Sequence, residues 1–213
     1  MRTIPYIAKI GSDTVEQQYF SNLTREPYFY YELKQVAKLT LAGLSPVEIG
    51  TKIKEDNLFQ CTTNKGINRL LSATYKRVAV LDKIMLNLLV HGSLNTSKLV
   101  ALIAIMKTNR LFLEFIEEVY LEKVRLGEQE LEPRDIRIFF NNKAEQSPKV
   151  AGWQESTLKK LSQVYSMILS DTGLINNTHK KMLTPPTIEQ ELLAHLRKMG
   201  DHRLIIALTG GRM

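Results

Sequence analysis

The 213-residue chain has few of the features that mark secreted, disulfide-rich or membrane proteins. Its single cysteine, Cys61, excludes an intrachain disulfide and a cysteine-rich zinc site, which fits a reducing cytosol. The first five residues lack the apolar core and cleavage site of a secretory signal. The most apolar stretch, Leu99–Met106, is far shorter than the ~20 residues of a membrane-spanning helix. We therefore expect a cytoplasmic protein that does not enter the membrane.

Catalytic signatures are also missing. The four histidines are scattered, with no His-x-x-x-His, Cys-x-x-Cys or Glu-x-x-His spacing to place metal ligands on one face. No glycine-rich phosphate loop and no Gly-x-Ser-x-Gly elbow occurs. The sequence thus predicts no metal, no cofactor and no enzyme, although a catalytic set of distant acids would leave no spacing signature.

Charge is unevenly distributed along this basic chain, whose net charge of +7 favours an anionic partner, with nucleic acid ahead of membrane or acidic protein. Lys and Arg outnumber Asp and Glu by 11 to 7 in residues 1–80 and by 12 to 8 in residues 131–213. In residues 81–130 the ratio is 6 to 7. We predict an N-terminal arm and helix-turn-helix lobe (1–80), a helical core (81–130) and a C-terminal helix-turn-helix lobe (131–213), all in the all-α class.

Acidic residues are absent from Asn57 to Leu81, where four basic residues occur. Helical spacing places one set of side chains on a polar face and another on an apolar face. The helix can therefore pack on one side and meet phosphate on the other. The polar face comprises Lys65, Arg69, Ser72 and Lys76, the apolar face Ile67, Leu70, Leu71, Thr74 and Val78.

A second helix is predicted just before this one. Ser45 is a candidate N-cap, Pro46 takes the first helical position, and Glu48 follows three residues after the cap. Two helices in this order favour a helix-turn-helix, in which the first braces the second in the major groove. The turn of residues 56–64 is longer than in the compact motif. The alternative is an ordinary helix pair whose basic face is only solvated.

The middle of the chain predicts helices at about 81–90, 97–108 and 110–126. The third has an apolar stripe beginning at Leu111 and Phe112. The other side of the helix carries Glu114, Glu117, Glu118, Glu122 and Lys123. Without a histidine at Glu-x-x-His spacing they indicate a solvated face, not a metal site.

The C-terminal third, like the N-terminal third, contains a predicted helix pair whose second helix has a basic face. Pro133 and Asp135 open a helix, and another begins near Glu155 or Ser156, with no acid from Ser156 to Ser170. We interpret this helix as a second recognition helix. Its packing face comprises Leu158, Leu161, Tyr165, Ile168 and Leu169, and its outer face Ser156, Lys159, Lys160 and Gln163.

Three further segments carry simpler predictions. Residues 174–175 and 182–184 flank a polar tip with Lys180 and Lys181, which fits the hairpin wing of a winged helix-turn-helix or a plain surface loop. The final apolar run, Leu204–Leu208, fits a strand. Ser12 and Asp13 are candidate caps of a short helix in the N-terminal arm. The helix of residues 28–41, which Gly43 ends, starts with four aromatics that fit packing better than base stacking.

Several segments in this order resemble the BrxA family, the small accessory proteins of BREX bacteriophage-exclusion systems. They are the helix of residues 44–56 with Asp56-Asn57-Leu58, then Asn68-Arg69-Leu70-Leu71, Val150 to Leu161, Leu169 to Ile175, and Leu204 to Leu208. The similarity covers most of residues 30–208. It implies a non-enzymatic, all-helical protein with a NusB-like core and helix-turn-helix elements that bind double-stranded DNA. It also implies neighbours that include a methyltransferase, a phosphatase-like protein and an ATPase.

Together these observations predict a DNA-binding accessory protein of low sequence specificity. The alternatives are a scaffold whose basic ends dock on acidic partner proteins and an RNA-binding regulator of NusB type. The phosphate contacts are assigned to Lys65, Arg69, Lys76, Lys159 and Lys160, with Arg77, Lys180 and Lys181 as additional basic residues. Asn68, Ser72, Ser156, Thr157 and Gln163 are assigned to base edges or phosphates.

Overall fold

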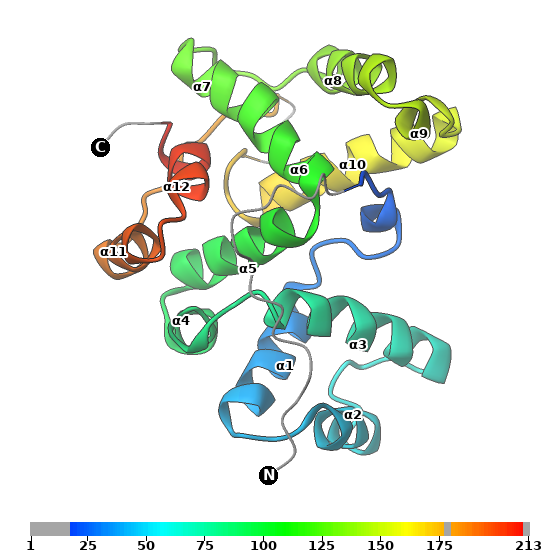
Figure 1. The fold of residues 1–213 in the computed structure, drawn as a ribbon, viewed down its shortest axis with the longest axis vertical. Coiled ribbons are helices and arrows are strands. Elements are labelled where there is room, and N and C mark those ends of the chain that lie inside the picture. The colour runs from blue at the N-terminus through cyan, green and yellow to red at the C-terminus, as the bar shows by residue number, and fades with distance from the viewer. Residues whose placement is uncertain (1–17, 177–179, 211–213) are drawn as a thin grey trace.

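The fold is all-α, as predicted (Figure 1). The computed structural model describes residues 18–176 and 180–210, so the predicted caps at Ser12 and Asp13 lie outside it. The helices are α1 (Tyr30–Leu41), α2 (Pro46–Glu55), α3 (Asn64–Val78), α4 (Lys83–His91), α5 (Leu94–Thr108), α6 (Arg110–Phe115), the π-helix η2 (Ile116–Leu121), α7 (Glu122–Arg125), α8 (Pro133–Gln146), α9 (Pro148–Ala151), α10 (Glu155–Asp171), α11 (Gln190–Lys198) and α12 (His202–Thr209), with a short 3-10 helix η1 (Asn22–Thr24) before them.

Helices α1, α2 and α3 form one end of the molecule (Figure 1). Gly43 follows α1 with a φ of +85°, a left-handed conformation that favours glycine and ends the helix, as predicted. The predicted capping box at the start of α2 is confirmed, because Ser45 and Glu48 each bond the other's backbone N–H. These local signals set the start of α2 and the end of α1.

Helices α4 and α5 pack together as a buried hairpin and correspond to the two helices predicted at residues 81–90 and 97–108. All eight residues of Leu99–Met106 are buried, which explains an apolar run too short to span a membrane. Gly92 joins the two helices, and a Cβ there would lie 2.5 Å from the carbonyl oxygen of Leu88. The close approach therefore requires glycine. In the described part of the chain, no helix is long and apolar enough to cross a bilayer.

The predicted helix of residues 110–126 is present but contains a π-helical turn. Asn109 caps its start, since its side-chain oxygen accepts from the backbone N–H of Phe112 at 2.8 Å. The π-helix η2 then interrupts the α-helical pattern between α6 and α7. A π turn holds more residues than an α turn, so it rotates the residues after it relative to those before it.

The charged side of this helix is only partly the solvated face that we predicted, since Glu118 and Glu122 are exposed but Glu114 and Lys123 are buried. Glu114 is only 7% exposed and accepts hydrogen bonds from Tyr19 at 2.8 Å and from Arg110 at 2.6 Å. The buried ammonium of Lys143 lies 2.6 Å from Glu114 and 2.6 Å from Glu118. The prediction was wrong for Glu114 because two of its partners, Tyr19 and Lys143, come from the arm and from α8, which helical periodicity cannot reveal.

Two other charged residues of this helix also join separate segments. Lys123, predicted on the solvated face, is buried and pairs with Glu128 and with Asp135 at 3.0 Å. Glu117 receives two hydrogen bonds from Arg203 of α12, at 2.6 and 2.7 Å. These ion pairs therefore link α8 and α12 to the long helix.

An aromatic cluster joins the C-terminal helices to the core. Tyr165 of α10 lies 5.0 Å from Phe112 and 4.9 Å from Phe115, measured between ring centroids. Phe139 and Phe140 of α8 complete the cluster. Buried apolar residues from α1 to α12 form one continuous cluster. The division into three segments at residues 80 and 130 stays a prediction.

The last third of the chain differs from two predictions. The structure shows an isolated bridge between Ile175 and Leu183, in the described part of the supposed wing, and another between Glu130 and Met182. The hairpin wing is thus not confirmed, and residues 177–179 lie outside the described chain. The apolar run Leu204–Leu208 belongs to helix α12, so the strand prediction was wrong. Five consecutive apolar residues show no period that separates helix from strand.

Candidate nucleic-acid interface

Helix α3 presents its basic face to solvent, as the sequence predicts. Thr63 caps the helix, with its hydroxyl oxygen accepting from the backbone N–H of Gly66 at 3.1 Å. Every predicted member of the apolar face is buried, and all four predicted polar-face residues are exposed, as is the neighbouring Asn68. The exposed side chains are Lys65, Asn68, Arg69, Ser72 and Lys76.

Helix α2 supports α3 from below in Figure 1. The hydroxyl of Tyr75 on α3 donates to the backbone carbonyl of Pro46, at the start of α2, at 2.6 Å. Ile49 and Ile53 of α2 are buried. Between the helices the chain passes through Asn57 and Gln60, both with positive φ. The first helix of the pair therefore holds the second in place, and the outer face of α3 remains open.

Arg77 does not belong to this exposed face. Its side chain is 3% exposed, and its guanidinium donates to the backbone carbonyls of Tyr28 at 2.8 Å and Glu26 at 2.5 Å. Burial lowers the pKa of Arg77 to about 10. The assignment of Arg77 to phosphate was wrong, because the arm before α1 covers it. Lys76, beside it, stays exposed and lies 3.9 Å from Glu26, a distance at which a surface ion pair is weak.

Helix α10 presents the second predicted face. Ser156, Lys159, Lys160 and Gln163 are exposed, whereas Thr157 is half-buried. The opposite side is anchored in the core through Leu161, Tyr165, Ile168 and Leu169, all buried, and through the half-buried Leu158. In Figure 1, α3 and α10 both lie on the side of the molecule away from α11 and α12. The two basic helices thus share one side of the fold.

The predicted wing residues differ from each other. Lys180 is exposed, whereas Lys181 is half-buried and donates to the hydroxyl of Ser166 on α10 at 2.9 Å. Lys181 therefore fastens the loop to α10 and is less available to phosphate than predicted.

Lys149 on α9 was missed by the sequence analysis. It is exposed, lies 4.1 Å from the centroid of the Phe20 ring, and donates to the side chain of Gln18 at 3.2 Å. It adds a cation next to the start of α10. The polar run of residues 141–149 contained this lysine, but no periodic face singled it out.

Fold and surface together define a small all-helical protein with two exposed basic helices. The sequence matches the BrxA family model over residues 17–200. It is 36% identical to the BREX protein BrxA of Bacillus cereus (strain H3081.97), over 92% of this chain and 98% of that protein. It is 21% identical to the BREX protein BrxA of Escherichia coli O9:H4 (strain HS), over 92% of each. The chain therefore belongs to the BrxA family of BREX phage-defence systems.

A solved structure shares the fold. The crystal structure of an uncharacterized protein from Magnetospirillum magneticum superposes with a TM-score of 0.78 at 20% identity. The match covers 91% of this chain and 99% of that one. The arrangement of helices therefore persists where most residues differ. The finer likeness to NusB stays a prediction.

Proposed function

We propose that the chain binds double-stranded DNA through the outer faces of α3 and α10, with low sequence preference and without catalysis. The observation that carries the proposal is the outer face of α3. Five polar side chains, three of them basic, are exposed there on a helix with no acidic residue, and α2 braces the helix from behind. Cations on a rigid face neutralise phosphates and release counterions whatever the base sequence.

Family membership supports the biological setting of the proposal. We infer that the chain acts in the cytoplasm as an accessory protein of a BREX system. Its partners would be double-stranded DNA and other proteins of the system, such as a methyltransferase, a phosphatase-like protein or an ATPase. Hydroxyls and amides such as Ser72 and Gln163 can contact phosphates or base edges, but they discriminate little between bases without several such contacts.

The test is a titration of nucleic-acid-free protein against unrelated duplexes at several salt concentrations. We expect affinity to fall steeply with salt, similarly for every duplex. Lys65→Gln with Arg69→Gln removes two cations and should reduce the slope of log affinity against log salt by about 1.8, because each phosphate contact contributes about 0.9. Lys159→Gln with Lys160→Gln should act likewise.

A matched control separates local contacts from net charge. Lys38→Gln with Lys198→Gln removes the same charge from exposed positions on α1 and α11 and should leave the slope unchanged. Equal effects of control and α3 variants would contradict a site on α3. Displacement of duplex by single-stranded RNA at equal concentration would favour the RNA-binding alternative instead.

A further inference from the structure

An apolar groove lies between α7 and α8, where two large apolar side chains meet solvent. Leu126, directly after α7, is 67% exposed, and Ile138 of α8 is 53% exposed. The buried side chains of Val119 and Phe139 also line the groove, whose volume is about 200 Å³. Covering such side chains removes apolar surface from water, which stabilises a complex.

The rim of this groove is acidic, although the chain as a whole is basic. Residues 114–135 contain eight Asp and Glu against three Lys and Arg. The buried Lys123 pairs with Glu128 and Asp135, and Lys143 pairs with Glu118, so the exposed Glu122 is the lining carboxylate that faces solvent with no cation against it among these pairs. The acidic residues in the lining are Glu118, Glu122, Glu128 and Asp135.

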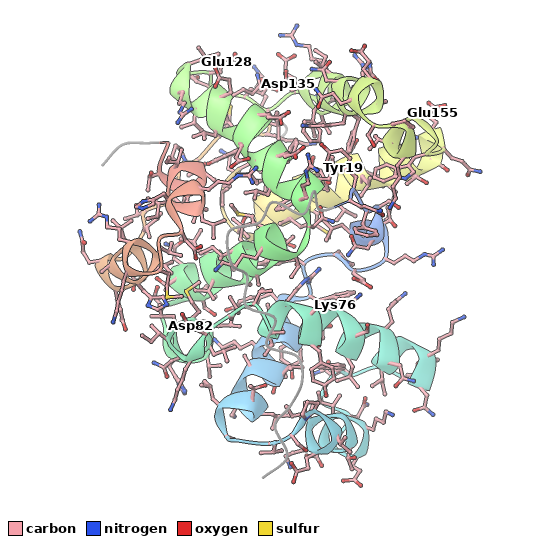
Figure 2. All side chains as sticks on the ribbon, viewed as in Figure 1. Tyr19, Lys76, Asp82, Glu128, Asp135 and Glu155 are labelled. Carbon is pink, nitrogen blue, oxygen red and sulfur yellow. The ribbon has the colours of Figure 1, made fainter. Side chains whose placement is uncertain are left out.

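The groove is far from α3. Figure 2 shows Glu128 and Asp135 together at one end of the molecule, with Lys76 of α3 well away from them. Phosphate would be repelled at the acidic rim, so DNA is not the occupant. The basic outer face of α3 in a second copy is also a poor match, because its exposed side chains are all polar and offer no apolar anchor.

We propose that this groove docks a basic amphipathic segment of another protein, with leucine-like anchors at helical spacing and Lys or Arg beside them. The anchors would cover Leu126 and Ile138, and the cations would meet the glutamates of the rim. Amphipathic helices recognise apolar grooves in this way, and complementary charge fixes the partner and its orientation. The inference goes beyond DNA binding, since the groove and α3 can be occupied together.

The test uses the full chain and a fluorescein-labelled peptide of about 14 residues, roughly four helical turns, built from Leu and Lys at helical spacing. Measured by fluorescence anisotropy, the peptide should bind wild-type protein, and a peptide with Glu in place of Lys should not. Leu126→Ser with Ile138→Ser should weaken binding at least about tenfold, as should Glu122→Lys. All three residues are exposed, so thermal unfolding should be unchanged.

The matched control is Val47→Ser with Leu94→Ser, which removes two exposed apolar residues elsewhere and should leave peptide affinity unaltered. Equal weakening by both pairs, or no binding of the Lys peptide by wild-type protein, would overturn the proposal. So would dimerisation in sedimentation that the Leu126→Ser and Ile138→Ser pair abolishes, since a second copy would then be the occupant. DNA affinity is measured on the same variants and should not change.

Discussion

Glu114 is the residue whose environment differs most from what the sequence indicates. Burial alone would raise its pKa, but hydrogen bonds from Lys143, Arg110 and Tyr19 outweigh burial and lower the pKa below the usual 4.5. A lowered pKa means that the folded state holds this carboxylate ionised more strongly than the unfolded state does. Its contribution to stability is therefore present above about pH 4.5 and is lost as the pH falls through the lower, folded pKa.

We predict that Glu114→Gln lowers the free energy of unfolding by about 3 kcal/mol at neutral pH, because the buried Lys143 loses one of its two carboxylate partners. The difference from wild type should narrow as the pH falls below about 4. Urea unfolding at a series of pH values measures both effects. Glu145→Gln, at an exposed position on α8, is the control and should match wild type at every pH. A constant difference across the series would contradict the lowered pKa.

At this scale the sequence predicted exposure well and pairing poorly. The polar face of α3 follows from helical spacing alone, since Lys65 and Arg69 are one turn apart. Arg77 is buried against Glu26 and Tyr28, about 50 positions earlier in the chain. Lys143 is buried against Glu114, 29 positions earlier. No local pattern encodes such contacts, so one predicted phosphate contact had to be withdrawn.

The pair α2 and α3 is the element on which the proposed DNA contact depends, and two glycines within it differ sharply. A Cβ at Gly66, in the first turn of α3, would lie 2.5 Å from the sulfur of Cys61 and 2.9 Å from the capping hydroxyl of Thr63. At Gly50, in α2, a Cβ would meet Tyr75 and Leu71 at 3.7 and 3.9 Å, which are ordinary contacts. Gly66 is therefore fixed by packing and Gly50 is not.

We predict that Gly66→Ala destabilises the protein by about 1–3 kcal/mol through overpacking of the turn. Gly50→Ala should instead stabilise it by about 0.5–1 kcal/mol, because alanine loses less backbone entropy in a helix. Thermal and urea unfolding of the two variants provide the comparison. If both substitutions shift stability in the same direction, the contacts around Gly66 do not control the start of α3.

Strong local signals account for the elements that were predicted correctly. These signals are local in the sequence: the capping box at Ser45, the proline at the start of α8, and the acid-free amphipathic stripes. The strand predicted at Leu204–Leu208 failed because burial of nearly every residue hides the helical period. The π turn of η2 was not predicted, because the apolar spacing of residues 110–126 also fits a continuous α-helix.

The whole molecule is held by one apolar cluster, which suggests how it unfolds. Trp153, the one tryptophan in the sequence, is half-buried and packs against this cluster between α9 and α10. We predict that its fluorescence and the far-ultraviolet circular dichroism change at the same urea concentration, as in a two-state transition. Separate midpoints would indicate that the N-terminal helices unfold independently of the C-terminal ones.

The separation of basic and acidic surfaces affects how DNA duplexes covered by this protein would interact with one another. The basic face of α3 and the acidic groove lie in different halves of the longest axis, while α10 lies in the same half as the groove, so this pair of surfaces contributes a dipole component from the groove towards α3 (Figures 1 and 2). Near a duplex this dipole would turn α3 inward before contact, within about one Debye length of 8–10 Å. A duplex covered in this way would present glutamates outward. We expect such coated duplexes to repel one another and stay dispersed, whereas a uniformly basic protein would condense them.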